Sequence, residues 1–183
     1  MRRPSAAVGT SVFFAAAPGV VAGLVPWLLT GWRLRDPVPA ALSGLAIPVR
    51  VIGGVLLAAG VVVLVDAFVR FVVEGAGTPA PIAPTEHLVI GGLYRYVRNP
   101  MYLAVVASIL GQALLLGQPV LLLYAAAVWL TVASFVRWYE EPALHRTFGV
   151  QYQAYRAAVP AWWPRRRPWY PSLPPPTGKP DPG

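Results

Sequence analysis

The sequence contains no cysteine and very few charged residues. Without a thiol the chain forms no disulfide, no thiolate nucleophile and no thiolate-bound metal. Charged residues make up only 12% of the 183 residues, against 56% hydrophobic residues, and the mean hydropathy is +0.56. This balance is typical of a chain that lies in a lipid bilayer rather than one folded around a water-soluble core. The length favours one domain, which we assign to residues 1–164.

Long stretches of the chain carry no charged residue, or carry charged residues only near their ends. A helix of ~20 residues crosses ~30 Å of hydrocarbon, and four stretches reach or approach that length. Prolines within the first are expected to kink a bundled membrane helix, not to end it. The sequence therefore predicts an all-α, polytopic membrane helix bundle of about four transmembrane helices, with room for a short extra helix near residues 40–47. The predicted spans are Val8 to Trp32, Ile47 to Phe71, Met101 to Gly117 and Val120 to Trp138.

The basic residues predict the orientation of these spans. Arg2 and Arg3 precede an apolar run far longer than the core of a signal peptide, so we expect a first membrane helix there. Four crossings place both termini on one side of the membrane. Of the 15 Lys and Arg residues, all but Arg33, Arg35 and Arg50 then share that side, which predicts cytoplasmic termini. The excess of basic over acidic residues therefore needs no nucleic-acid partner.

The third and fourth spans form a hairpin with charges at both of its ends. No Asp, Glu, Lys or Arg lies between Arg98 and Arg137, and the turn is predicted at Gly117-Gln118-Pro119. Because a hairpin returns to the side it left, Arg98 is expected to face the same water layer as Glu140 and Glu141. Ionisable groups at a membrane surface are costly to hold together, so this cluster is a candidate functional site.

The segments outside the spans carry further predictions. Residues 74–100 are rich in Gly and Pro, which predicts a lid or collar over the cytoplasmic face. After Pro142, apolar residues recur with helical spacing and predict a cytoplasmic amphipathic helix. Residues 165–183, rich in Pro and Arg, are expected to be disordered. The amphipathic stripe consists of Leu144, Phe148, Tyr152 and Tyr155.

Several of these charged residues also have a purely structural interpretation. Asp66 and Arg70, four residues apart, are expected to form an ion pair on one helix. Glu140 and Glu141 are alternatively the cap of the next helix. Tyr152 and Tyr155 are expected to pack rather than to line a site. His87 and His145 have no spaced partners, so we expect no metal site.

Three motifs in order carry a family resemblance. GGLYRYVRNPMY, an uncharged hairpin, and EEPALHRTFGVQYQAYRAAVPAWWP resemble the C-terminal half of the isoprenylcysteine carboxyl methyltransferase and phospholipid methyltransferase family of membrane enzymes. The resemblance extends from about Thr78 to Pro164. The resemblance implies a cytoplasmic pocket for S-adenosylmethionine, which leaves as S-adenosylhomocysteine, and a lipophilic acceptor that arrives from the membrane. By position it implies roles for Arg98, Pro100, Tyr102, Glu140 and Glu141. Asn99 stands where the family has a histidine, and an amide carries no charge and is no general base.

The chemistry of S-adenosylmethionine agrees with these residue types. Its ammonium and ribose hydroxyls suit a carboxylate, its carboxylate suits an arginine, and its sulfonium suits the face of Tyr94, Tyr102 or Trp138. We therefore propose Arg98, Asn99, Glu140 and Glu141 as candidate catalytic residues. The candidate donor-binding residues are Gly92, Leu93, Tyr94, Arg95, Arg98, Asn99, Pro100, Tyr102, Glu140 and Glu141.

Two other functions stay open at this point. Sterol reductases resemble the same hairpin and use NADPH, and a non-catalytic adaptor would bind anionic lipid through its arginine-rich tail. The expected partners are membrane lipids and a lipophilic or lipidated acceptor, whose identity the sequence leaves open together with the oligomeric state. Lysine is rare relative to Ala, Arg, Val and Pro, which suggests a bacterial inner-membrane protein with a cytoplasmic site.

Overall fold

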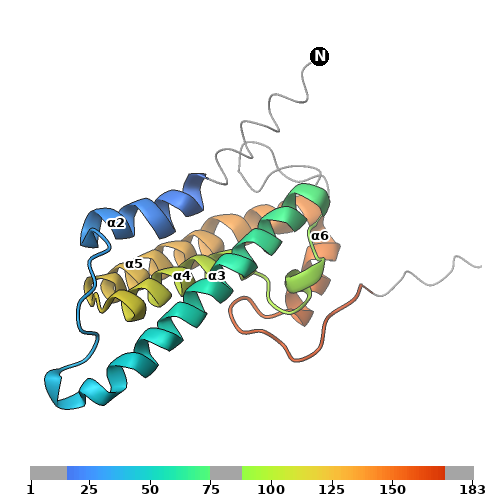
Figure 1. Cartoon of the computed structure of the whole chain (residues 1–183). Helices are drawn as coiled ribbons and strands as arrows, with labels where there is room; N and C mark the ends of the chain where they lie inside the picture. The colour runs from blue at the N-terminus through green and yellow to red at the C-terminus, as the bar shows by residue number, and fades with distance from the viewer. Residues whose placement is uncertain (1–15, 75–87, 172–183) are drawn as a thin grey trace, which may run out of the picture.

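The computed structural model describes residues 16–74 and 88–171, with the side chains of Phe68 and of residues 71–74 excepted. Every regular element in these two ranges is helical, as predicted (Figure 1). The elements are η1 (Val20–Leu24), α2 (Val25–Thr30), η2 (Ala40–Leu45), α3 (Ala46–Glu74), η3 (Gly92–Arg95), α4 (Pro100–Leu116), α5 (Val120–Phe135), η4 (Val136–Glu140) and α6 (Glu141–Ala158).

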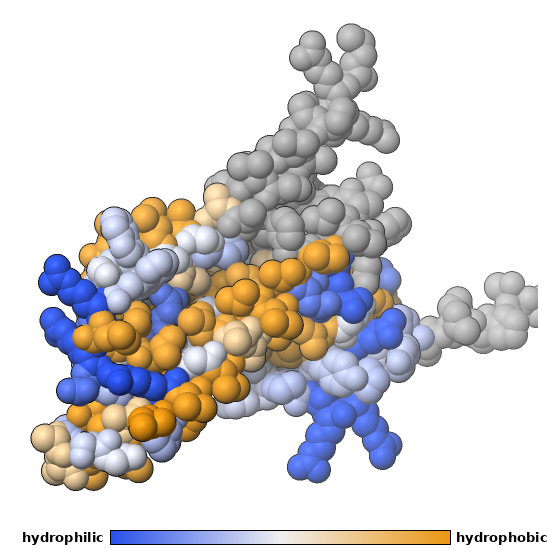
Figure 2. Space-filling view, in the orientation of Figure 1, coloured by the Kyte–Doolittle hydropathy of each residue, from blue (hydrophilic) through white to orange (hydrophobic). Residues whose placement is uncertain are grey.

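Two helices are long and apolar enough to cross a bilayer. They include α3 and α5 and run from Ala40 to Ala67 and from Val120 to Ala158; two further apolar helices, Ala16–Thr30 and Pro100–Leu116, are shorter. The 17 residues of α4 extend about 25 Å, slightly less than a typical hydrocarbon core. Figure 2 shows apolar side chains along the middle of the molecule and hydrophilic ones at both ends. The structure supports a membrane protein, while the count of four crossings stays a prediction.

Helices α3 and α4 approach closely because small residues line their contact. A Cβ added at Gly111 would lie 2.5 Å from the backbone nitrogen of Leu57, and one added at Gly53 would lie 2.8 Å from the carbonyl oxygen of Gly111. Backbones that approach this closely gain packing contacts that larger side chains would prevent. Gly53 and Gly111 therefore permit the close packing of α3 against α4.

The first helix shows how a proline is accommodated in the bundle. Pro26 has no N–H to donate to the carbonyl of Ala22, and the preceding turn is a π-helix. The side-chain amide of Gln112 donates to that carbonyl at 2.7 Å, and the hydroxyl of Tyr124 donates to the carbonyl of Val21 at 2.9 Å. These bonds tie the first helix to the α4–α5 hairpin.

The hairpin turns where the sequence predicts it. Gly117 ends α4 in the left-handed conformation, with φ of 65°, and Pro119 precedes the first residue of α5. The α-carbon of Gly117 also faces the backbone of Arg35, so this glycine is required both for the turn and for the close contact. A core of apolar residues joins the two helices: Val105, Ile109, Ala113, Leu121 and Ala125.

The helix that contains the fourth span continues past Trp138, which corrects the expectation of a separate capped helix. Residues 120–148 run from α5 into α6 as one long helix of about 43 Å, well beyond the hydrocarbon thickness. Glu140 has helical dihedral angles and makes no capping hydrogen bond. Pro142, which lacks an N–H, follows a π-helical turn instead of starting a new helix. The capping interpretation of the glutamate pair is therefore wrong.

The continuous helix bends within α6. Gly149 has φ of 48° and ψ of −121°, a conformation that only glycine adopts readily. Beyond the bend, Tyr152 and Tyr155 are buried and pack with the partly buried Leu144 and Phe148. The predicted apolar stripe is confirmed, although it is divided between two helical pieces.

The chain after α6 is ordered as far as residue 171. The backbone N–H of Arg165 donates to the carbonyl of Tyr96 at 2.9 Å, and that of Trp169 donates to the carbonyl of Arg95 at 3.0 Å. Residues 165–171 of the predicted tail thus bind backbone carbonyl groups at the end of η3 and just after it. Residues 172–183 lie outside the described residues, as do residues 75–87 of the predicted lid.

Candidate functional site

A buried ionic cluster lies at the junction of α4, α6 and the C-terminal segment. The Nη1 group of Arg98 donates to Oε1 of Glu141 at 2.7 Å and to the hydroxyl of Tyr152 at 3.0 Å. Oε2 of Glu141 lies 3.3 Å from Nη2 of Arg156. The side chains of Arg98 and Glu141 are only 11% and 10% exposed. The predicted proximity of the two ends of the hairpin is therefore confirmed.

The second glutamate has a different partner. Glu140 accepts a hydrogen bond from the hydroxyl of Tyr102, on the first turn of α4, at 3.0 Å. Glu140 follows the apolar part of the long helix, past the end of α5. Burial raises the pKa of its carboxyl above the ordinary range; the Tyr102 hydrogen bond opposes this, Glu141 reinforces it, and Arg98 opposes it. The two carboxylates therefore differ: Glu141 is paired with guanidinium groups, whereas Glu140 is held by a phenol.

The C-terminal segment fixes the residues that begin α4. The backbone N–H of Arg98 donates to the carbonyl of Pro160 at 2.9 Å, and the amide of Asn99 donates to the carbonyl of Ala161 at 3.1 Å. Pro100 starts the helix, where its missing N–H leaves no bond unmade. Asn99 is 7% exposed and acts here as a link between α4 and the segment that follows α6.

A small cavity of about 60 Å³ lies beside the ionic cluster. Three tyrosines, Tyr94, Tyr152 and Tyr155, supply aromatic walls, and the hydroxyl of Tyr155 donates to the carbonyl of Tyr94 at 2.7 Å. Apolar residues, including Val136 and Leu144, complete the wall. The polar residues that line the cavity are Arg98, Asn99, Glu140 and Glu141.

One atom in this cluster lacks a partner. The Nε–H group of Arg98 is buried and has no hydrogen-bond acceptor. A buried donor left without an acceptor costs about 1 to 3 kcal/mol, more for a charged group. An anionic group beside Arg98 would satisfy this donor.

The structure separates the predicted donor-binding residues into two groups. Tyr94, Arg98, Asn99, Glu140 and Glu141 line the cavity, and Tyr102 contacts it through Glu140. The others line surfaces outside this cavity, because successive residues of the turn at η3 point in different directions. They are Gly92, Leu93, Arg95 and Pro100.

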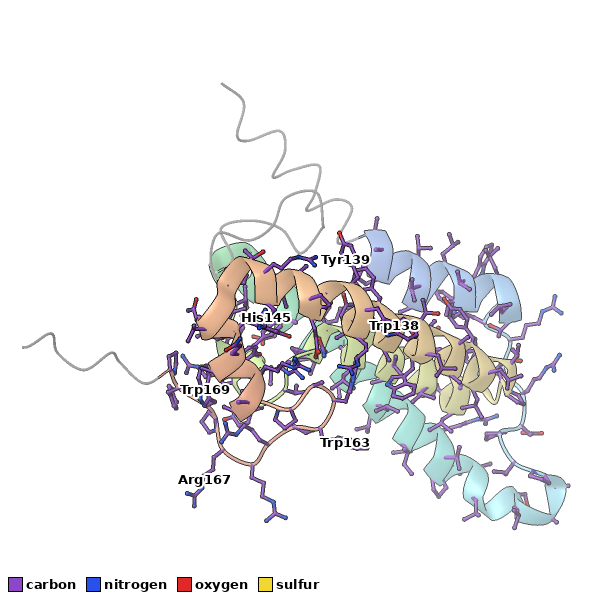
Figure 3. All side chains as sticks on the ribbon, turned by 180° about the vertical axis from the view of Figure 1, so that it is seen from behind. Trp138, Tyr139, His145, Trp163, Arg167 and Trp169 are labelled. Carbon is purple, nitrogen blue, oxygen red and sulfur yellow. The ribbon has the colours of Figure 1, made fainter. Side chains whose placement is uncertain are left out.

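Arg95 and Trp138 illustrate this separation. The guanidinium of Arg95 lies over the ring of Tyr170, 4.5 Å from its centroid, and does not line the cavity. Trp138 is 78% exposed and also does not line it; Figure 3 shows it on the outside of the long helix. Of the residues expected to pair a carboxylate or to face a sulfonium, Arg98 and Tyr94 are at the cavity.

Three residues at the site were missed by the sequence analysis: Tyr152, Tyr155 and Arg156. The expectation that the two tyrosines only pack is wrong, because both also line the cavity. Tyr152 packs in the core as predicted, but its hydroxyl also accepts a hydrogen bond from Arg98. Arg156 contacts Glu141 from the last turn of α6. Tyr152 and Arg156 are four residues apart and share a helix face, so a basic residue one turn beyond an aromatic stripe residue was the available signal.

Comparison with known proteins places this site in a family. A model of the phospholipid methyltransferase family matches residues 48–151, which is more than half of the chain and extends from the first turn of α3 into α6. No significant match is found among curated proteins or solved structures. The matched range includes the Arg98 segment, the uncharged hairpin and the glutamate pair. The chain therefore belongs to the phospholipid methyltransferase family, a family of membrane methyltransferases.

Proposed function

We propose that the protein is an S-adenosylmethionine-dependent methyltransferase that acts on a lipophilic or lipid acceptor, with its donor site at the Arg98 cavity. The observation that carries this proposal is the unpartnered Nε–H group of a buried arginine beside a buried carboxylate, Glu141, and a partly buried one, Glu140. Neutral, cationic and anionic groups meet within one small volume there. S-adenosylmethionine is a zwitterion with an additional sulfonium, and it matches such a mixture.

Each polar part of the donor has a suitable partner among these residues. Arg98 would pair with the carboxylate of the methionine moiety, since its Nε has no other acceptor. Glu140 would accept from the ammonium or a ribose hydroxyl, because Glu141 is already paired with two guanidinium groups. The faces of Tyr94 and Tyr152 would attract the sulfonium, at about 0.5 to 2 kcal/mol.

The cavity is smaller than this ligand. A volume of about 60 Å³ corresponds to roughly two water molecules, so the walls must separate when the donor binds. The ion pair of Arg98 and Glu141 joins α4 to α6, and the bend at Gly149 lies between Glu141 and Tyr152. We propose that α6 moves at this bend to admit the donor, while Glu141 and Tyr152 keep Arg98 in place for its carboxylate.

When bound, the donor supplies an electrophilic methyl group and leaves as the neutral thioether. The chain holds the reactants in line and excludes water, which in well-oriented cases supplies about 7 to 11 kcal/mol of the barrier reduction. Asn99 cannot accept a proton, and its amide is engaged with Ala161. An amine acceptor would need Glu140 as its base, whereas a carboxylate acceptor of the isoprenylcysteine type would need none.

The family and the two long apolar helices place the protein in a membrane. We propose the bacterial inner membrane and a cytoplasmic site, because the basic residues that flank the hairpin, Arg95, Arg98, Arg137 and Arg146, would then follow the positive-inside rule. Cysteine labelling of an Arg137→Cys variant from either face of sealed vesicles tests this orientation. Labelling from the periplasmic face alone would contradict it.

Calorimetry and methyl transfer test the donor site together. Purified protein in detergent is expected to bind S-adenosylhomocysteine, and Glu140→Gln and Glu141→Gln are each expected to weaken binding at least tenfold. Asp36→Asn, which neutralises an exposed carboxylate far along the chain, is the matched control. Transfer of radiolabelled methyl into extracted lipid should likewise fall in both glutamine variants and stay unchanged in Asp36→Asn. Unchanged binding in both glutamine variants would reject the site.

The same preparation separates the alternatives. A reductase would be stabilised against heat by NADPH rather than by S-adenosylhomocysteine, and the family match favours methyl transfer over that reaction. A non-catalytic adaptor would lose its function on removal of residues 165–183 and keep it in both glutamine variants.

A further inference from the structure

An apolar groove lies on the other side of the segment that carries Arg98. This open groove of about 560 Å³ runs between α3 and α4, and its walls are almost entirely apolar, including Leu56, Ala59, Leu103 and Ala107. At one end it continues into a second recess of about 570 Å³, with which it shares Val63, Leu93 and Tyr96.

The second recess is charged where the groove is apolar. Asp66 and Arg70 form the predicted ion pair there, with Nε of Arg70 3.1 Å from Oδ2 of Asp66. Arg95 lines the same recess, held over the ring of Tyr170, and its buried Nε–H group has no hydrogen-bond acceptor. The guanidinium of Arg95 therefore offers a donor to a ligand at this mouth.

The dimensions of the groove match one leaflet of a bilayer. From Leu56 to Asp66 helix α3 rises about 15 Å, which is half of a ~30 Å hydrocarbon core. The charged mouth therefore lies where the headgroup region begins, if the apolar part of α3 occupies the hydrocarbon. An apolar channel of that length beneath a cationic mouth is complementary to a glycerophospholipid.

We propose that this groove holds one resident phospholipid, with an acyl chain between α3 and α4 and its phosphate at Arg95. The phosphate would accept from the unpartnered Nε–H group of Arg95. Tyr170 and Pro168 of the C-terminal segment form the outer wall of the mouth.

This lipid lies apart from the proposed donor cavity. Neither the groove nor its mouth shares a lining residue with the cavity. Tyr94, Arg98 and Asn99 face the cavity, whereas Leu93, Tyr96, Val97 and Pro100 face the groove. Residues 92–100 thus form the wall between the two, and a bound lipid would brace the segment from behind. The inference does not rest on the proposed function.

Quantitative lipid analysis of the full chain, purified in detergent and washed extensively, tests the proposal. The wild type is expected to retain phospholipid in stoichiometric amount. Ala107→Phe fills the groove and is expected to reduce this to background, whereas Ala127→Phe makes the same change on the exposed surface of α5 and is expected to retain it. Equal retention by the two phenylalanine variants would overturn the proposal.

The charged mouth is tested separately, which also covers a failure of Ala107→Phe to fold. Arg95→Gln is expected to lower the affinity for added phospholipid about tenfold, as measured by the rise in melting temperature of delipidated protein. Arg167→Gln is the control, since Arg167 is an exposed arginine of the same C-terminal segment that points away from the bundle (Figure 3). Equal affinities, or a retained lipid without a phosphate, would overturn it.

Discussion

The two ends of the α4–α5 hairpin use charged residues in opposite ways. At the end near α6, Arg98 and Glu141 form a 2.7 Å ion pair whose side chains are 11% and 10% exposed. Near the turn end, an ion pair joins Arg50 to Asp36 at 3.6 Å, and their side chains are 36% and 89% exposed. Figure 2 shows hydrophilic surface at both ends, so burial, not location, distinguishes them.

Burial changes what the charges can do. At the turn end polar groups mostly tie a loop to the hairpin: the N–H of Arg35 donates to Leu116, and the amide of Gln118 donates to Arg33. A solvated ion pair adds at most about 1 kcal/mol. Two charges inside the protein lose several kcal/mol of hydration each, and an apolar pair would often be as stable. Retaining them near α6 is best explained by ligand binding.

The largest expected effect comes from removing one buried charge. Arg98→Ala leaves Glu141 with Arg156 alone and is expected to lower the free energy of unfolding by about 3 to 5 kcal/mol. Arg50→Ala at the turn end is expected to lower it by no more than about 1 kcal/mol. Thermal unfolding in detergent measures both.

A double replacement sharpens this test. Arg98→Met with Glu141→Leu removes both charges and is expected to recover most of the lost stability, but no binding of S-adenosylhomocysteine. A double variant that stayed as unstable as Arg98→Ala would show that packing, and not the unpaired charge, sets the effect.

The same contrast separates what the sequence could predict from what it could not. The uncharged interval from Arg98 to Arg137 fixes the hairpin, and with it the meeting of Arg98 and Glu141, because two helices of that length must return. The sequence could not predict that Arg98 and not Arg95 lines the cavity. This depends on the path of η3, a short turn whose side-chain directions no periodicity determines.

In the long helix, the sequence predicted a break that the structure does not have. Pro142 is a strong predictor of a helix start, yet a π-helical turn carries α5 into α6 without a break. The bend occurs instead at Gly149, which looks unremarkable in sequence. Tertiary contacts of Tyr152 and Tyr155 decide this bend, and a local pattern cannot contain them.

Glycine replacements compare the backbone at the two ends. Gly149→Ala forces a side chain into a conformation that costs about 1 to 3 kcal/mol, although nothing lies within 4 Å of the new Cβ. Gly117→Ala meets a similar dihedral penalty and the backbone of Arg35 in addition. Both are expected to lower the melting temperature. Only Gly149→Ala is expected to weaken donor binding, since it displaces Tyr152.

Calorimetry of the two alanine variants, at a temperature where both are folded, makes this comparison. Equal loss of donor affinity in both would mean that the bundle responds as a whole and that the bend has no separate role.

The pH dependence of donor binding compares the carboxylates of the two ends. Because burial raises the pKa of Glu140, its carboxyl takes up a proton at higher pH than an exposed one. Affinity for S-adenosylhomocysteine is therefore expected to fall, by up to tenfold per pH unit, as pH decreases through that raised pKa. Glu140→Gln should abolish this dependence, and Asp36→Asn should preserve it. A wild-type affinity independent of pH would exclude an ionised Glu140 from the site.

The smallest expected effect compares two buried amides, one at each end. Asn99 donates to Ala161 at 3.1 Å and Gln118 donates to Arg33 at 2.6 Å, and both side chains are buried. Asn99→Ala and Gln118→Ala each remove one such bond and are expected to lower the free energy of unfolding by about 0.5 to 1.5 kcal/mol.

Their effects on function should differ. Asn99→Ala loosens the link between α4 and the C-terminal segment, so donor affinity is expected to fall a few-fold, while Gln118→Ala leaves it unchanged. Because an amide neither accepts nor donates a proton in catalysis, the rate of methyl transfer at saturating donor should stay within tenfold of the wild type in both. A loss of turnover in Asn99→Ala with stability and donor affinity preserved would instead place this amide in contact with the reacting groups.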